Sequence, residues 1–254
     1  MKVKPVKPIV VSVEVEIATL DLENTLERYL ALYKDRKVKI IKDFATRIRE
    51  LWEKHRRKIE QIALRLHYNA IAVIPGNLNL PEFHEQMTQG YEITWESDKF
   101  KDGGSWSGIK SFQVEKDRIV LFHNCLNLGD HLFTKQLLGK NLMQISGFPQ
   151  EVLNKRIIGK KPFKGQINVY DKQQTFAGLA IEDYLAIQAE TWTTTKRHLD
   201  SETCSLLVRS YCGPYIPGFY MDPVVNQAGQ LCADVFGFDN ADGGLAPRPA
   251  TVFD

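Results

Sequence analysis

The sequence predicts an α+β fold, with a long N-terminal amphipathic helix or a bent pair of helices, a mostly antiparallel sheet and several shorter helices. Residues 22–68 contain no Pro and no Gly, and their apolar residues recur at intervals of three and four, which is the helical period. Residues 91–123 contain short apolar or alternating runs separated by turn residues, which is typical of strands. The chain has 254 residues, 43% hydrophobic and 25% charged, which is ordinary for a globular protein.

The first predicted region is an N-terminal strand or arm at residues 1–20. Within residues 9–17, Val and Ile alternate with Ser and Glu, as in a strand with one buried face. These polar residues interrupt the run of ~7–15 apolar residues that a signal peptide needs, so we expect none. No apolar run approaches the ~18–20 residues that cross a bilayer, so we expect no membrane partner.

The second predicted region is helical and covers residues 21–70, with Asp21 as its N-cap. One straight helix of ~45 residues would be ~68 Å long, which exceeds the width of a compact domain of this size. We therefore expect either a bend near Asp35 or a part that projects and meets a partner. The apolar stripe is the predicted protein interface, formed by Ile41, Phe44, Ile48, Trp52, Ile59 and Ile62.

The third predicted region is a mixed α+β domain at residues 71–236. Strands are expected at residues 71–74, 91–96, 109–115, 118–123 and 166–170, and helices at residues 131–145, 150–157 and 175–191. A hairpin is expected around residues 226–229 and an exposed loop at residues 102–108, because both contain turn-forming residues. Residues 237–254 are predicted to be an extended C-terminal tail with little to pack.

Charge is distributed unevenly along the chain. Residues 34–58 contain eleven Lys/Arg against four Asp/Glu, whereas the whole chain carries a net charge of only +2. Clustered cations attract phosphate backbones or acidic protein surfaces. The residues predicted to make such contacts are Lys37, Lys39, Lys42, Arg47, Arg49, Lys54, Arg56, Arg57 and Lys58. The acidic C-terminal segment is expected to attract this basic stretch, within the chain or between neighbours.

The densest cluster of catalytic residue types is His123, Asp130 and His131. Two His eight residues apart and an Asp are suited to a metal-dependent hydrolase or nuclease, although a strand end followed by a helix cap gives the same pattern. His198 and Asp200 form an H-x-D sequence, which is part of the triad that binds non-haem iron. No His follows His198 in the chain, so the distal His of such a triad is missing. No cofactor and no metal site is predicted from these patterns.

The four cysteines form no C-x-x-C pair and the chain has no N-x-[ST] sequon, which favours a reducing, cytoplasmic location. Phosphate-loop, dinucleotide-binding, nucleophile-elbow and zincin motifs are also missing from the sequence. We therefore expect a non-enzymatic subunit of a larger assembly, joined to other subunits or to itself through its N-terminal helix and extended termini. The alternatives are a component that binds RNA or DNA through residues 34–58 and a diverged metal-dependent hydrolase or nuclease.

Overall fold

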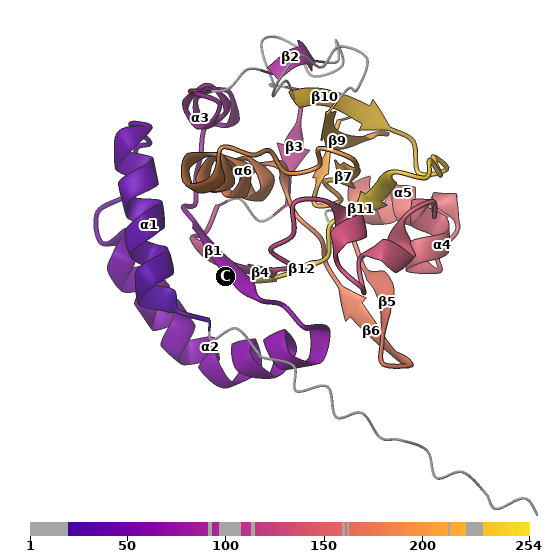
Figure 1. The fold of residues 1–254 in the computed structure, drawn as a ribbon, viewed down its shortest axis with the longest axis horizontal. Helices are drawn as coiled ribbons and strands as arrows, with labels where there is room; N and C mark the ends of the chain where they lie inside the picture. Colours follow the sequence, from indigo (N-terminus) through magenta and orange to yellow (C-terminus); the bar gives the residue numbers. More distant parts are fainter. Residues whose placement is uncertain are drawn as a thin grey trace, which may run out of the picture.

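The computed structural model describes residues 20–90, 93–96, 108–112, 115–158, 161, 163–212, 214–221 and 231–254. Figure 1 shows how the helices and strands are arranged. The strand predicted at residues 9–17 and residues 102–107 of the predicted loop lie outside the described residues.

The chain forms both helices and sheets, as the sequence predicts. The helices are α1 (Leu22–Asp35), α2 (Phe44–Leu66), α3 (Leu80–Met87), α4 (Leu142–Ser146), α5 (Gln150–Ile158) and α6 (Ile181–Thr195), with 3-10 turns η2 (Leu128–Asp130) and η3 (Lys135–Leu137). The strands are β1 (Ala70–Ile74), β2 (Ile93–Glu96), β3 (Lys110–Ser111), β4 (Arg118–Phe122), β5 (Gly165–Val169), β6 (Lys172–Phe176), β7 (Cys204–Leu206), β8 (Ser210–Tyr211), β9 (Ile216–Met221), β10 (Leu231–Phe236), β11 (Leu245–Pro247) and β12 (Ala250–Phe253).

The N-terminal helical region is a pair of helices. α1 begins after Asp21, whose carboxylate accepts a hydrogen bond from the amide of the third helical residue at 3.0 Å, and α1 ends at Asp35. Lys37 and Asp43 then have φ angles of 57° and 68°, a left-handed conformation that interrupts a helix. α2 begins directly after Asp43. The structure therefore has the break that we expected for a bent pair, and the alternative of one straight helix is wrong.

A three-stranded antiparallel sheet, in the order β1–β4–β12, lies at the centre of the fold. α1 and α6 both pack on β1, and α2 packs on β4. In Figure 1, α1 and α2 lie on one side of this sheet and α6 lies on the other. Helices on both faces explain why β1 and β4 are nearly continuous apolar runs.

This packing corrects the predicted interface, because the sheet of the same chain covers most of the apolar stripe of α2. The buried members of the stripe are Phe44, Ile48, Trp52 and Ile59. α2 runs along the sheet instead of projecting from it, so these side chains are not available to a partner in this fold. Ile41 lies before α2 and is 53% exposed, and Ile62 is half-buried.

The second sheet has five strands in the order β11–β7–β9–β10–β2. β9 and β10 pair antiparallel, with Met221 opposite Leu231, and the turn of the hairpin predicted around residues 226–229 lies outside the described residues. Among the described strands, only the pairs β10–β2 and β11–β7 are parallel. The sheets are therefore mostly antiparallel.

The predicted C-terminal tail is wrong for the residues that form β11 and β12. β11 pairs with β7, and β12 pairs with β4 in the central sheet. Leu245 and Phe253 are 2% and 4% exposed. A few apolar residues suffice here because backbone hydrogen bonds to two sheets position them. The N-terminal helices, the middle region and the C-terminal segment consequently contribute to one hydrophobic core.

Charged side chains cross this core at two places. Asp183 at the start of α6 accepts hydrogen bonds from Arg118 Nε at 2.7 Å and from Arg209 Nη1 at 3.3 Å. Arg248 donates from Nη2 to an oxygen of Asp200 at 2.9 Å. All five side chains are at most 1% exposed. These buried pairs connect β4, α6 and the C-terminal strands.

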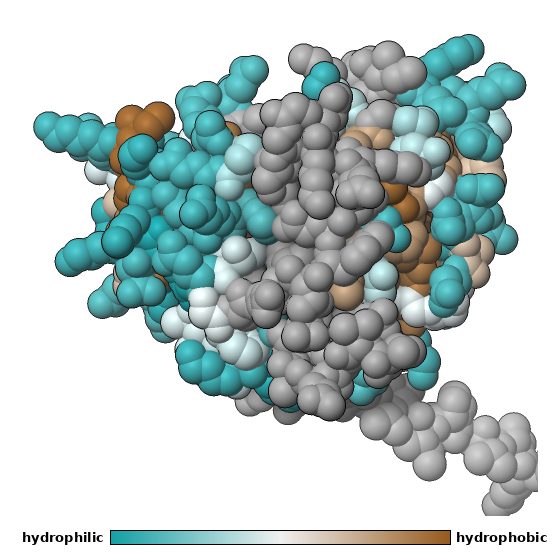
Figure 2. All heavy atoms as spheres, turned by 90° about the horizontal axis from the view of Figure 1, so that it is seen from above, coloured by the Kyte–Doolittle hydropathy of each residue, from teal (hydrophilic) through white to brown (hydrophobic). Residues whose placement is uncertain are grey.

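The described surface over α1 to α3 is mostly hydrophilic when the molecule is viewed from above, with a small hydrophobic area at its edge (Figure 2). None of the described helices combines the length and the apolar composition that a membrane-spanning segment requires.

Candidate functional site

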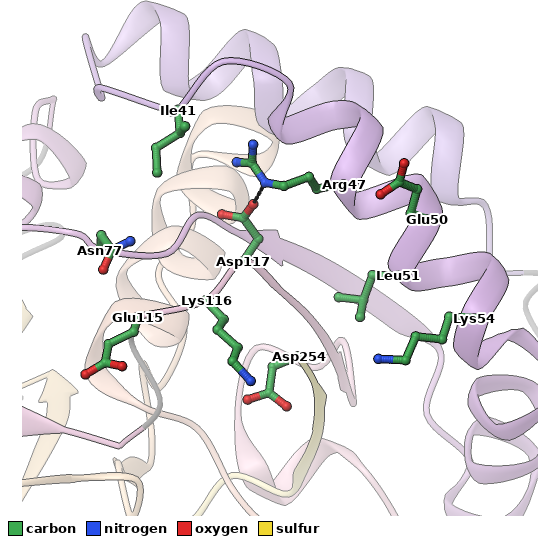
Figure 3. Close-up of a pocket in the computed structure, with 10 residues that line it drawn as sticks. All are labelled: Ile41, Arg47, Glu50, Leu51, Lys54, Asn77, Glu115, Lys116, Asp117 and Asp254. Atoms are coloured by element: carbon green, nitrogen blue, oxygen red, sulfur yellow. Dashed lines mark hydrogen bonds and ion pairs between the residues drawn. The ribbon is translucent and has the colours of Figure 1, made fainter.

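An open cavity of about 470 Å³ lies beside α2 (Figure 3). Its walls are α2, the loop after β1, the turn before β4 and the end of β12. We call it the α2 groove. Its lining residues are Ile41, Arg47, Glu50, Leu51, Lys54, Asn77, Glu115, Lys116, Asp117 and Asp254.

Asp117 connects two walls of the α2 groove. One carboxylate oxygen accepts a hydrogen bond from Arg47 Nε at 2.6 Å, and the other accepts from the Gly76 amide at 2.8 Å. Arg47 Nη1 also donates to the Lys42 carbonyl at 2.7 Å, just before α2 begins. The Asp117 side chain is only 12% exposed, so water weakens its ion pair less than that of a surface residue. One carboxylate therefore fixes the distance between α2 and the loop after β1.

Gly76 allows this loop to approach the turn before β4. A Cβ atom at Gly76 would lie 2.6 Å from the Glu115 carbonyl oxygen and 2.6 Å from the Lys116 carbonyl carbon. Both contacts are with backbone, which cannot rotate away as a side chain can. Any side chain at this position would push the wall of the groove outwards.

We expect Gly76→Ala to lower the free energy of unfolding by about 1–3 kcal/mol, as overpacking of a filled site does. Urea unfolding measures the change. The matched control is Gly243→Ala, because a Cβ atom at Gly243 would have no neighbour within 4 Å. Equal stability of the two variants would show that the close approach at Gly76 imposes no constraint.

Apolar and charged side chains share the surface of the α2 groove. Leu51 and Lys54 project from α2 into the space, and Lys116 and Asp254 face it from the opposite wall (Figure 3). Ile41 adds apolar surface at the end nearest the start of α2. An exposed apolar floor with charges of both signs at its rim is a typical composition for a protein-binding surface.

Carboxylates from α1, α2, α3 and the turn before β4 lie among the nine predicted cations. Four of the nine predicted cations are in ion pairs, which are Lys39–Glu82 at 3.1 Å, Arg47–Asp117 at 2.6 Å, Arg49–Glu23 at 2.7 Å and Arg56–Glu60 at 3.1 Å. The other five are exposed, namely Lys37, Lys42, Lys54, Arg57 and Lys58. The paired carboxylates reduce the positive potential that a phosphate backbone would meet.

The C-terminal strand lies against this basic helix. The ring centroid of Phe253 lies 5.5 Å from the ring centroid of His55. It lies 5.8 Å from Lys58 Nζ. Phe253 is 4% exposed. The two segments that we expected to attract one another are therefore neighbours, and a buried aromatic ring contributes to their contact alongside charge.

The structure brings the two predicted catalytic histidines together. The rings of His123 and His131 are 3.9 Å apart, and His67 at the end of α2 contributes a third imidazole through its contact with Phe133. His123 is 1% exposed, and its Nδ1 atom has no hydrogen-bond partner. Burial, with His131 and Arg248 nearby, lowers the pKa of His123 to about 2. This histidine is therefore neutral at physiological pH.

Asp130 does not join these histidines as the third catalytic residue. Its carboxylate accepts a hydrogen bond from the Asn127 amide at 2.9 Å, where it completes the cap of the turn η2. Burial also lowers the pKa of His131. Within the described residues, His, Cys, Asp and Glu side chains nowhere form a group of three that could hold a metal ion. The predicted trio therefore forms a pair of neutral imidazoles in contact, tilted by 36°, and a separate cap.

The two residues of the H-x-D sequence have structural partners. His198 Nδ1 contacts the Gln188 amide group, and Asp200 bonds to Arg248 and to the Thr203 hydroxyl. The thiol of Cys204 is buried, which raises its pKa well above its usual value and disfavours the nucleophilic thiolate. These residues stabilise the core.

Sequence reasoning missed most residues of the α2 groove. Only the fold brings residues 76–77, 115–117 and 254 to the side of α2. The sequence indicates that residues 75–77 and 115–118 form turns. It does not indicate which helix these turns contact.

Comparisons of the chain with models of protein families, with curated proteins and with solved structures find no match. The function therefore has to be inferred from the surfaces of the molecule itself.

Proposed function

We propose that the chain is a non-enzymatic binding subunit of a larger assembly, which holds a segment of a partner polypeptide in the α2 groove. The observation that supports this is the apolar surface of the exposed Ile41 and the partly buried Leu51, between charged walls that Asp117 holds apart. This proposal keeps the predicted role of the N-terminal helices in assembly but moves the contact from the buried stripe to the groove.

The charges of the groove define the segment that fits it. Glu50 and Lys54 are one helical turn apart on the same wall, and Lys116 and Asp254 lie opposite them. A segment with one apolar side chain between a positively charged residue and a negatively charged residue would complement this surface. Surface charges of both signs give such an interface specificity more than affinity.

The nucleic-acid alternative is less well supported by the same geometry. A phosphate backbone carries one sign of charge, whereas Glu50, Glu115 and Asp254 line the groove together with its cations. The hydrolase alternative loses its predicted site, because Asp130 is turned towards Asn127 and away from a shared site with the histidines.

The experiment selects peptides from a random phage-displayed library on the wild-type protein and then measures their affinity for two variants. Ile41→Asp places a charge on the apolar surface of the groove. Val152→Asp is the control, because Val152 is an exposed aliphatic side chain on α5, outside the groove, and is 36% exposed, against 53% for Ile41. We expect Ile41→Asp to weaken the groove-binding peptides by about 10- to 100-fold, the equivalent of the ~1.5–3 kcal/mol that burial of an aliphatic side chain contributes.

Two outcomes would contradict this proposal. Selected peptides that bind Ile41→Asp as tightly as the wild type would show that they do not use the groove. Failure to select any peptide, together with salt-sensitive binding of a generic oligonucleotide, would favour the nucleic-acid alternative.

A further inference from the structure

A second exposed apolar surface lies at the far end of α2. Five large apolar side chains in the described part of the chain are more than about a third exposed, and three of them belong to the segments that meet at the His67 ring. They are Leu64 at 54%, Leu132 at 73% and Tyr170 at 58% exposed. Leu64 is one helical turn before His67, and Tyr170 contacts the His67 ring. We call Leu64, His67, Leu132 and Tyr170 the His67 patch.

The aromatic part of the His67 patch is a packed cluster. The ring centroids of His67 and Tyr170 are 5.0 Å apart, and each ring also contacts Phe133, at 5.0 Å and 5.3 Å respectively. Phe133 is 7% exposed and forms the base of the cluster. Figure 1 shows the end of α2 beside the turn that joins β5 and β6. Three segments distant in sequence therefore present one rigid surface.

The backbone at this surface is strained. The β5–β6 hairpin has a two-residue turn, in which Tyr170 and Asp171 have φ angles of 47° and 60°, and His67 has a φ of 55°. Such a turn favours Asn-Gly, because residues with large side chains are disfavoured at positive φ. Stability alone does not explain a half-exposed tyrosine at this position. Strain of this kind clusters at binding sites.

Exposed cations surround the His67 patch. Arg65 follows Leu64, Lys135 is three residues after Leu132, and Lys172 closes the turn after Tyr170. The exposed carboxylates in these segments are Asp171 and Asp130, so the three cations outnumber them by one. The imidazoles of His67 and His131 add no positive charge, because burial lowers the pKa of both. A partner with negative charge would complement this surface.

We propose that the His67 patch binds an acidic polypeptide segment of a partner protein, anchored by an aromatic or aliphatic side chain that packs on Tyr170 and Leu132. Rigid aromatic residues at the centre of a contact are typical anchors for such segments. The cations at the rim select the charge of the partner and increase the rate of association. This contact does not depend on the α2 groove.

The test uses the same displayed peptide library, with two variants of the patch. Tyr170→Asn removes the anchor and places a residue that tolerates positive φ in the turn, so its thermal unfolding midpoint should stay close to that of the wild type. Leu132→Asp adds charge at the most exposed position of the patch. We expect a class of acidic peptides with an apolar anchor that loses at least tenfold in affinity with either variant and weakens as salt increases.

Ile41→Asp should leave the affinity of this class unchanged, which separates the His67 patch from the groove. Peptides that depend on Tyr170 but are basic or uncharged would overturn the proposed chemistry. Selection that yields no peptide sensitive to Tyr170→Asn or Leu132→Asp would overturn the binding role of the patch, whatever the result for the groove.

Discussion

Replacement of Asp183 by Asn is expected to lower the free energy of unfolding by about 3–5 kcal/mol, because it leaves two buried guanidinium groups without their shared carboxylate. The two oxygens of Asp183 accept hydrogen bonds from Arg118 Nε at 2.7 Å and from Arg209 Nη1 at 3.3 Å. Arg118 and Arg209 are 0% and 1% exposed, so water cannot replace the lost charge. Urea unfolding followed by circular dichroism measures the difference.

The matched control for this prediction is Glu190→Gln on the same helix. Glu190 pairs with Arg28 of α1, whose side chain is 47% exposed, so the loss of this pair should cost about 0–1 kcal/mol. Asp183→Asn also keeps the oxygen that caps the Ala180 amide, so the measured loss reports on the arginines. A loss for Asp183→Asn no larger than that for Glu190→Gln would show that the buried charges do not depend on this carboxylate.

The sequence predicted the helical pair well because its signal is local. The helical period of the apolar residues and the absence of Pro and Gly indicate α1 and α2. Asp21 caps α1 as expected. The same stripe could not show what covers it, because an apolar face looks alike whether its own sheet or a partner protein packs on it. The predicted interface was therefore placed on buried side chains. Of the residues in that apolar stripe, only Ile41 lines the α2 groove.

Two helix predictions failed through local hydrogen bonding. Asp130 was expected to cap a helix at residues 131–145, but its carboxylate turns back to the Asn127 amide, and only η3 and α4 form in that segment. The helix expected at residues 175–191 begins at Ile181, because the preceding residues pair with β5 as strand β6. The sequence of β6, Lys-Gln-Gln-Thr-Phe, has no apolar alternation that would predict a strand. The two-residue turn before β6 also lacks the Asn-Gly that usually indicates a hairpin.

The candidate histidine site was partly predictable. His123 and His131 flank one short connection, so their proximity follows from sequence separation alone. The contributions of His67 and Arg248 could not be found, because these residues are far away in the chain and only the packing of α2 and of the C-terminal strands brings them near. These residues also change the chemistry of His123, because the Arg248 cation disfavours protonation of the buried imidazole and the hydrogen bond with the His67 backbone favours it.

We expect His123 to make the protein less stable in mild acid. In the unfolded chain an imidazole has a pKa of about 6.5, whereas burial, His131 and Arg248 lower the pKa of His123 in the fold to about 2. The unfolded state therefore binds more protons at any pH between these values, so stability falls as the pH falls below about 6.5. This single group should remove roughly 2.5 kcal/mol between about pH 7.5 and about pH 4.5.

The measurement compares urea unfolding of the wild type with that of His123→Gln across this pH range. Carboxylates and the other histidines titrate in both proteins, so the difference between their stabilities isolates His123. Gln keeps a donor for the hydrogen bond to the His67 backbone but cannot be charged. The wild type should lose stability relative to the variant as the pH falls. Parallel curves would mean that the fold accepts a protonated His123, and that this residue is not the neutral, buried imidazole described above.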